Sequence, residues 1–262
     1  MLDYDLIDDW APQLERALAD AVPATVCQKI AGTRYEFVED ALEDLLRGAD
    51  RGQVVERALR WITEGHVLAY HGTRLIQEDV ISIGTNGLQP LVAMQRRGRL
   101  QRALCSHRSW KEVEGKLDDV LRAHSGVGTL RHREGQVHLT LSRSGLVNGF
   151  NHYLAQGSEF DGLIAYDLLG DEGRALLATD GTALVVKVAV PGRSAIEGTQ
   201  RFFTMEQTLA RGDLPNLVAP FLEAWAFKLS DPTYQSSQQM LDCGIWYREA
   251  VPAKWIVGIE PP

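Results

Sequence analysis

The sequence predicts an α+β protein in which a helical N-terminal layer precedes a mixed region of helices and short strands. Apolar residues recur at helical spacing over the first 64 residues, whereas short apolar runs typical of strands begin only at residue 66. These runs follow no regular strand–helix–strand period, which argues against a doubly wound parallel sheet. A chain of 262 residues is also long enough to bury a sizeable core without disulfide or metal support.

Three helices are expected before residue 65. The first has an apolar stripe formed by Leu6, Trp10, Leu14 and Leu18. For the second, residues 33–36 read as a capping box and Gly48 as the stop. Asp50 is placed to cap the third. We therefore expect a helical segment at 1–64 and a second region at 65–262.

The rest of the chain mixes both kinds of element. Predicted strands cover 66–70, 136–142, 183–190, 245–251 and 255–260. Predicted helices cover 74–83, two segments within 92–123, 145–155, 165–178 and 218–229, and Thr204 opens a further capping box.

Charge and cysteine usage limit the class of protein. The net charge of −8 means that the surface as a whole does not attract polyanions, so a nucleic-acid site would need a local basic patch. Three separated cysteines without a C-x-x-C pair fit a reducing compartment. The acidic N-terminus does not resemble a signal peptide, and the longest uncharged run is too short to span a bilayer. We expect a cytoplasmic protein with no membrane partner.

Several common chemistries have no motif in this sequence. It contains no Walker lysine loop, no G-x-S-x-G elbow, no H-E-x-x-H and no dinucleotide glycine fingerprint after a strand. His124, His132 and His138 are close in sequence but lack partner ligands at fixed offsets, so no metal site is predicted.

The most informative stretch is Tyr70-His71-Gly72-Thr73-Arg74, followed by Gly87-Leu-Gln-Pro90. A histidine at a strand end can donate a hydrogen bond to a ribose hydroxyl, and a glycine beside it lets a ligand approach the backbone. This pattern resembles the first motif block of the ADP-ribosyltransferase superfamily, on its diphtheria-toxin and poly(ADP-ribose) polymerase (H-Y-E) side. The resemblance implies a split mixed or antiparallel sheet with helices, and NAD as the substrate.

The same resemblance assigns roles to the residues of this block. His71 and Gly72 would position NAD, with Thr73 beside them in the cofactor-binding block. Arg74 would contact the cofactor phosphates, because a guanidinium suits pyrophosphate.

The second block expected from the family presents an aromatic ring to the nicotinamide. The strand at 137–142 is followed by Phe150 and Tyr153, which lie three residues apart on one helical face. Either ring could stack on the pyridinium by cation–π attraction, and both could equally be core aromatics. The family's strand tyrosine is replaced here by His138 or Leu139.

The third block is a carboxylate on a late strand. Glu249 lies in the predicted strand 245–251, which Pro252 separates from the last strand. In the family such a glutamate stabilises the oxocarbenium-like state formed when NAD loses nicotinamide. The structural alternative is an edge glutamate that pairs with Arg248 or Lys254, and Glu206 is a weaker candidate because it lies in a capping box.

A related enzyme class shares part of this pattern. NAD-dependent RNA 2′-phosphotransferases have the H-G-T block and a V-H-L-S strand similar to Val137–Thr140, and arginines such as Arg131 and Arg133 would bind phosphate. Their N-terminal L-R-H block is absent from the first 60 residues. A non-catalytic module of the same fold that binds NAD, a nucleic acid or a partner chain is the further alternative; it predicts that Glu249 faces away from His71.

Together, these blocks predict a mono-ADP-ribosyltransferase that moves ADP-ribose from NAD to a macromolecular acceptor, protein or nucleic acid. The one basic cluster could steer phosphates and is otherwise a solvated helix face. Its arginines are Arg96, Arg97, Arg99, Arg102 and Arg108. By analogy with transferases of this type, a bacterial toxin or defence effector, with an antitoxin as its partner, is a further expectation.

Overall fold

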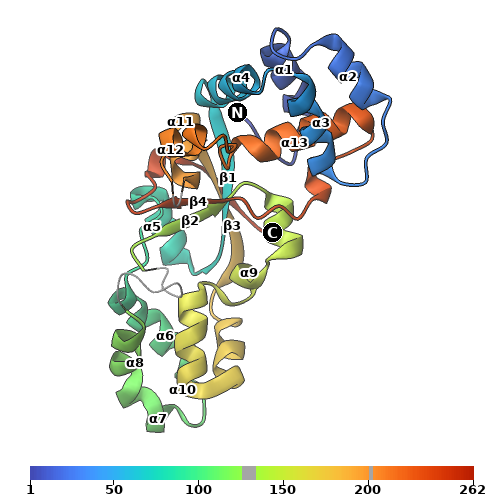
Figure 1. The fold of residues 1–262 in the computed structure, drawn as a ribbon. Coiled ribbons are helices and arrows are strands. Elements are labelled where there is room, and N and C mark those ends of the chain that lie inside the picture. The colour runs from blue at the N-terminus through green and yellow to red at the C-terminus, as the bar shows by residue number, and fades with distance from the viewer. Residues whose placement is uncertain (126–133, 201–202) are drawn as a thin grey trace. The chain divides into compact units, whose positions relative to one another are not determined.

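The computed structural model describes residues 1–125, 134–200 and 203–262 (Figure 1). The predicted α+β class is confirmed, because the described residues combine helices with one sheet of five strands in the order β4-β2-β1-β3-β5. These strands are β1 (His66–Leu75), β2 (Val137–Thr140), β3 (Thr182–Pro191), β4 (Gly244–Tyr247) and β5 (Ile256–Glu260). β3 and β5 run antiparallel, with Val185 opposite Glu260.

The chain divides into two compact units. Unit 1 comprises Met1–Ala69, Thr140–Gly145 and Ala189–Ile245, and unit 2 comprises Tyr70–Leu139, Leu146–Val188 and Trp246–Pro262. The N-terminal helices therefore share unit 1 with segments that come much later in the chain. The sequence-based division between residues 64 and 65 stays a prediction.

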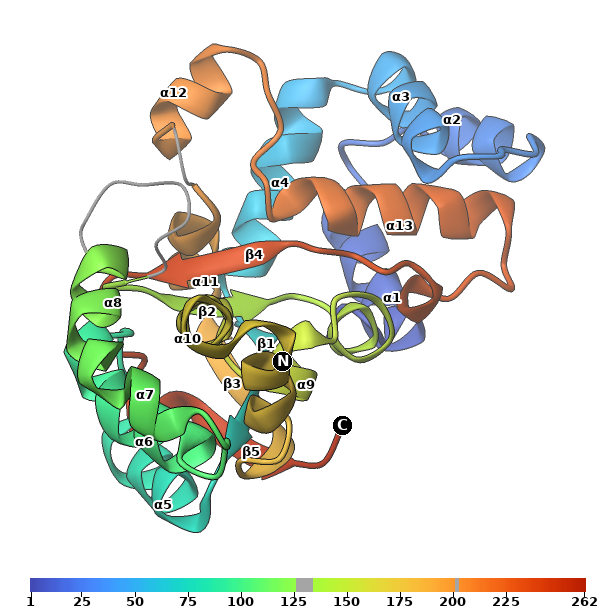
Figure 2. The same cartoon turned by 90° about the horizontal axis from the view of Figure 1, so that it is seen from below.

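Helices surround an aromatic core in unit 1. They are α1 (Ile7–Leu18), α2 (Ala24–Ala31), α3 (Val38–Gly48), α4 (Arg51–Thr63), α11 (Gly192–Thr199), α12 (Met205–Ala210), α13 (Val218–Ser230) and the short turn η4 (Ser236–Gln238). α13 packs against α1, α2, α3 and α4 (Figure 2). Phe221 of α13 meets Tyr4, Trp10 and Trp61 edge-on, at centroid distances of 5.6, 5.0 and 5.5 Å. Edge-to-face packing of this kind stabilises a core beyond its area burial.

The sequence predicts helix caps in unit 1 at Asp50, at Thr204 and at residues 33–36, and the structure tests all of them. The carboxylate of Asp50 accepts from the Gln53 amide at 3.1 Å, and Thr204 forms the predicted capping box with Gln207. Both caps are confirmed. The capping box predicted at residues 33–36 is wrong, because α3 begins only at Val38. Thr33 follows the end of α2, where its hydroxyl donates to the carbonyl of Lys29.

Unit 2 builds a helical core of its own. Its helices are α5 (Gln77–Asn86), α6 (Arg97–Leu104), α7 (Trp110–Val113), α8 (Leu117–His124), α9 (His152–Gln156) and α10 (Glu159–Leu177). Its shorter turns are η1 (Ala93–Arg96), η2 (Glu114–Lys116), η3 (Gly145–Gly149, whose first residue belongs to unit 1) and η5 (Ala253–Trp255). α10 packs against α6, α8 and α9, and Leu100, Leu121, Phe160 and Ile164 are buried where they meet.

Two predicted helices of unit 2 differ from those in the structure. Residues 74 and 75 continue β1, so the helix predicted at 74–83 runs instead from Gln77 to Asn86. It ends at Gly87, whose φ of 75° is a backbone conformation that glycine adopts readily. A Cβ at Gly87 would also collide with the backbone of residues 251–253. The predicted helix at 145–155 forms as two short pieces, η3 and α9.

Candidate functional site

A cavity of about 210 Å³ lies within unit 2. Three runs of chain line it: residues 71–73 of β1, residues 88–92 after α5, and residues 136–138 at the start of β2. The remaining lining side chains are Gln95, Arg96, Tyr153, Ser158 and Glu159. Segments that the sequence singled out separately therefore meet at one place.

His71 is the titratable strand-end residue of this cavity. Its Nδ1 lies 2.7 Å from the carbonyl oxygen of His138, and because a carbonyl only accepts, Nδ1 carries the proton. Burial lowers the pKa of His71; the hydrogen bond to His138 opposes this shift and the charge of Arg96 adds to it. The neutral imidazole then offers Nε2 as an acceptor. A ribose hydroxyl would therefore donate to His71, the reverse of the direction expected from the sequence.

Gly72 leaves no room for a side chain. A Cβ at this position would lie 2.8 Å from Cδ1 of Leu146, a residue that is itself only 2% exposed. Thr73 follows as a buried lining residue. The space beside Gly72 is therefore filled by Leu146, and the close approach of a ligand to this backbone stays a prediction.

Arg74 points elsewhere, since successive residues of a strand face opposite sides. Its guanidinium donates to the carbonyls of Leu154, Asp180 and Gly181 at 3.1, 3.3 and 2.6 Å. The described lining of the cavity does not include Arg74. Its predicted contact with cofactor phosphates would require it to leave these three carbonyls.

The structure separates the two aromatic candidates. Tyr153 lines the cavity, its hydroxyl donates to Oε1 of Glu159 at 3.3 Å, and its ring lies 4.0 Å from that of His152. Phe150 lies in the bend between η3 and α9 and is absent from the described lining. Of the two, Tyr153 is the ring that a ligand in the cavity would meet.

Glu249 does not lie on a strand. β4 ends at Tyr247, and Glu249 occupies an exposed bend after it that is not part of the described cavity lining. Two residues later Val251 exchanges backbone hydrogen bonds of 2.9 and 3.0 Å with Leu88, a lining residue. The chain thus reaches the cavity wall just beyond Glu249. His71 and Glu249 do not share the cavity.

The carboxylate that does line the cavity is Glu159, which the sequence analysis did not single out. It opens α10, and Ser158 caps the helix by accepting from the Asp161 amide at 3.1 Å. The predicted helix began only at residue 165, so this turn was missed. The signal was the S-x-x-D pattern of residues 158–161, a helix-capping sequence.

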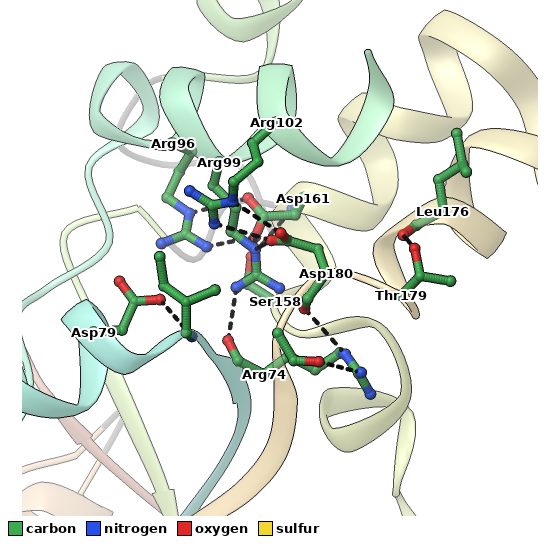
Figure 3. A network of polar contacts seen from close by, with 12 residues as sticks. Arg74, Asp79, Arg96, Arg99, Arg102, Ser158, Asp161, Leu176, Thr179 and Asp180 are labelled. Atoms are coloured by element: carbon green, nitrogen blue, oxygen red, sulfur yellow. Dashed lines mark hydrogen bonds and ion pairs between the residues drawn. The ribbon is translucent and has the colours of Figure 1, made fainter. Parts of the chain in front are cut away.

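Arg96, the cation of the cavity, is held by a buried acid (Figure 3). Its Nε and Nη2 donate to the two carboxylate oxygens of Asp161 at 3.0 and 2.6 Å, and the Asp161 side chain is 0% exposed. Burial alone would lower the pKa of Arg96, but Asp161 outweighs it and the pKa is raised. Paired through one edge, the guanidinium can still present Nη1 to a ligand.

The arginines predicted as a basic patch are paired with acids. Arg99 lies 3.6 Å from Asp161 and 3.4 Å from Asp180, and Arg102 binds both oxygens of Asp180 at 2.9 and 3.1 Å (Figure 3). Arg97 pairs with Asp118 and Arg108 with Glu172, at 2.7 and 3.5 Å. Each of these five arginines therefore lies within 3.5 Å of one of four acids, and the cluster forms a network of ion pairs.

Two further expectations concern metals and membranes. The described ranges hold no group of three or more His, Cys, Asp or Glu side chains placed to bind a metal ion. In the same ranges, every helix is too short or too polar to cross a membrane. His132 and the arginines at 131 and 133 lie outside the described residues.

Comparison with known proteins finds no matching family model, no matching curated protein and no matching solved structure.

Proposed function

We propose that this protein is an NAD-dependent mono-ADP-ribosyltransferase acting on a macromolecular acceptor, with an ADP-ribosyltransferase-like arrangement of its sheet. One observation supports this above others. Residues 71–73 of the Y-H-G-T block, residues 88–90 of the G-L-Q-P block, the start of the V-H-L-T strand and Tyr153 line the same cavity, although they are spread over more than 80 residues of sequence. A chance resemblance in short motifs gives no reason for them to converge.

The size and polarity of the cavity suit the reactive end of NAD. A cavity of about 150 Å³ can hold a benzene ring, so about 210 Å³ is enough for nicotinamide and part of its ribose. Tyr153 would stack on the pyridinium, and the backbone at Gly72 would pair with the carboxamide. His71 would accept from a ribose hydroxyl, and Arg96 would bind the pyrophosphate.

The reaction proposed is cleavage of the bond between the ribose carbon and the nicotinamide nitrogen. Nicotinamide leaves with the bonding electrons, which neutralises its ring charge, and an acceptor attacks the oxocarbenium-like ribose. Glu249 remains the predicted stabiliser of this state. For that role its bend would have to bring the carboxylate to the cavity, where Val251 already pairs with Leu88.

The RNA 2′-phosphotransferase alternative is favoured by one specific observation. His138 of the V-H-L-T segment lines the cavity together with His71, and its Nε2 lies 3.0 Å from the side-chain oxygen of Gln136. That enzyme class would also use NAD. It differs in requiring a 2′-phosphorylated RNA before NAD is consumed.

The test is nicotinamide release from NAD by the purified full-length chain, alone and with a cell lysate. We expect release that depends on the lysate and is lost in His71→Ala, while the exposed His66→Ala on the same strand behaves as wild type. Glu249→Gln in the same assay tests the stabiliser. Release that appears only with 2′-phosphorylated RNA would identify the alternative enzyme. No release under any of these conditions would contradict both and leave a binding module.

A further inference from the structure

Transfer to an O–H or N–H acceptor requires a group that removes the acceptor's proton. That group must lie beside the ribose carbon and also be reachable by the acceptor. Glu159 is the one acid among the described residues that line the cavity with His71.

The carboxylate of Glu159 is held in place by two neighbours. Its Oε1 accepts from the Tyr153 hydroxyl at 3.3 Å and lies 3.1 Å from Nε2 of His152. Because Tyr153 is itself a lining residue, the ring proposed to stack on the nicotinamide also orients this carboxylate. Glu159 stands in the first turn of α10, next to the helix cap at Ser158.

A second cavity adjoins this residue. It has a volume of about 370 Å³ and is lined by His152, residues 156–159, Gly162, Leu163 and Arg174. Ser158 and Glu159 line both cavities. All of these residues belong to unit 2. A transferase with two substrates needs two adjoining spaces, and Glu159 stands at their junction.

Building on the proposed function, we propose that the second cavity admits the acceptor and that Glu159 takes the proton from its nucleophilic O–H or N–H group. The carbon–nitrogen bond to nicotinamide breaks, and a bond forms between the same ribose carbon and the acceptor atom. The acceptor's proton passes to the carboxylate of Glu159 and then to solvent. With water as acceptor the products are nicotinamide, ADP-ribose and one proton, so the step balances without a further reactant.

The experiment exploits a nucleophile that carries no proton. Azide attacks without a base, so it can replace the protonated acceptor in a variant that lacks one. Nicotinamide release from NAD would be measured in the presence of the cell lysate for wild type, Glu159→Gln and the control Glu114→Gln, with and without sodium azide. Glu114 is an exposed acid in η2 and lies outside both cavities. Binding of a carbocyclic NAD analogue that resists cleavage would be measured alongside by calorimetry.

Loss of the proton acceptor is expected to slow release in Glu159→Gln by roughly 10²–10⁴-fold. Binding of the analogue should stay at the wild-type level. Azide should restore release to near the wild-type rate, with ADP-ribosyl azide as the product. Glu114→Gln should match wild type throughout.

The other outcomes separate the role of Glu159 from the proposed function. A Glu159→Gln variant as active as wild type would overturn the role of Glu159 and leave the proposed function standing. Loss of activity that azide does not restore would also overturn the proton-acceptor role, because the carboxylate would then act on the oxocarbenium or on binding. A wild-type chain that neither binds the analogue nor releases nicotinamide would overturn the proposed function itself.

Discussion

Nδ1 of His71 donates to the main-chain carbonyl oxygen of His138 across 2.7 Å, joining the first motif block to the strand of the second. This bond fixes the histidine tautomer and leaves Nε2 as an acceptor. The relationship explains why both blocks line the same cavity. The pKa of His71 therefore differs between the folded and the unfolded chain.

The stability of the fold should depend on pH through His71. Burial lowers the pKa of this residue below its ordinary value of 6.5, with a further contribution from Arg96. Below that value the unfolded chain binds a proton that the folded chain does not, so the free energy of unfolding falls as the pH drops. His71→Asn should show a smaller fall than wild type in urea unfolding between about pH 7.5 and 5.5. Equal falls in both proteins would contradict a lowered pKa of the His71 imidazole.

Neutralising the buried carboxylate of Asp161 should strongly lower the free energy of unfolding. Its 0% exposed carboxylate pairs with Arg96 and lies 3.6 Å from Arg99, so Asp161→Asn leaves Arg96 without its counter-charge and Arg99 with Asp180 alone. We expect the free energy of unfolding to fall by about 3–5 kcal/mol in denaturant titrations.

The matched control for Asp161 is Asp118, whose ion pair with Arg97 is close to half exposed on both sides. Asp118→Asn should change the free energy of unfolding by about 0–1 kcal/mol. Similar losses in the two variants would show that burial does not govern this network.

Gly72→Ala should destabilise the cavity wall. The new Cβ would lie 2.8 Å from a methyl carbon of Leu146, which is buried and has little freedom to move. We expect a cost of about 1–3 kcal/mol in urea unfolding. Much of it should disappear when Leu146→Val shortens the opposing side chain, as a double-mutant cycle would measure. Additive effects would show that the two residues do not contact each other in this way.

The choice between the two aromatic residues can be tested by ligand affinity. If Tyr153 stacks on the nicotinamide, Tyr153→Ala should weaken NAD binding by about 1–2 kcal/mol, which is roughly 5–30-fold. Tyr153→Phe keeps the ring and should lose much less. Phe150→Ala should bind as wild type, and a larger effect there than at Tyr153 would reverse the assignment.

Local sequence signals predicted much of the fold where a cap and an apolar stripe agree. Asp50 and Thr204 are such cases, and the caps formed there as predicted. The signal at residues 33–36 failed because α3 begins only at Val38, so Thr33 does not stand at its N-cap. Thr33 instead follows α2, a helix that the sequence analysis did not predict, and its hydroxyl donates to the Lys29 carbonyl.

The sequence predicted the strand residues of the candidate site, but it did not predict which charged residues pair there. Residues 71–73 are adjacent in sequence, so their shared location followed from the motif. Pairing between distant charges is invisible to a linear pattern. Arg96 and its neighbours therefore read as a basic patch, although Asp161 and Asp180 pair with them from beyond residue 160. Glu159 went unnoticed for another reason, because the predicted helix began only at residue 165 and not at its capping pattern. Glu249 was assigned to a strand that ends at Tyr247.

The central claim is that the cavity around His71 binds NAD, and calorimetric titration of NAD into the full-length chain tests it most directly. Wild type and the exposed control His66→Ala should bind alike, whereas His71→Ala and Tyr153→Ala should bind about fivefold more weakly or worse. Equal affinity in all four proteins would place NAD elsewhere on the chain. No binding to wild type would contradict the account.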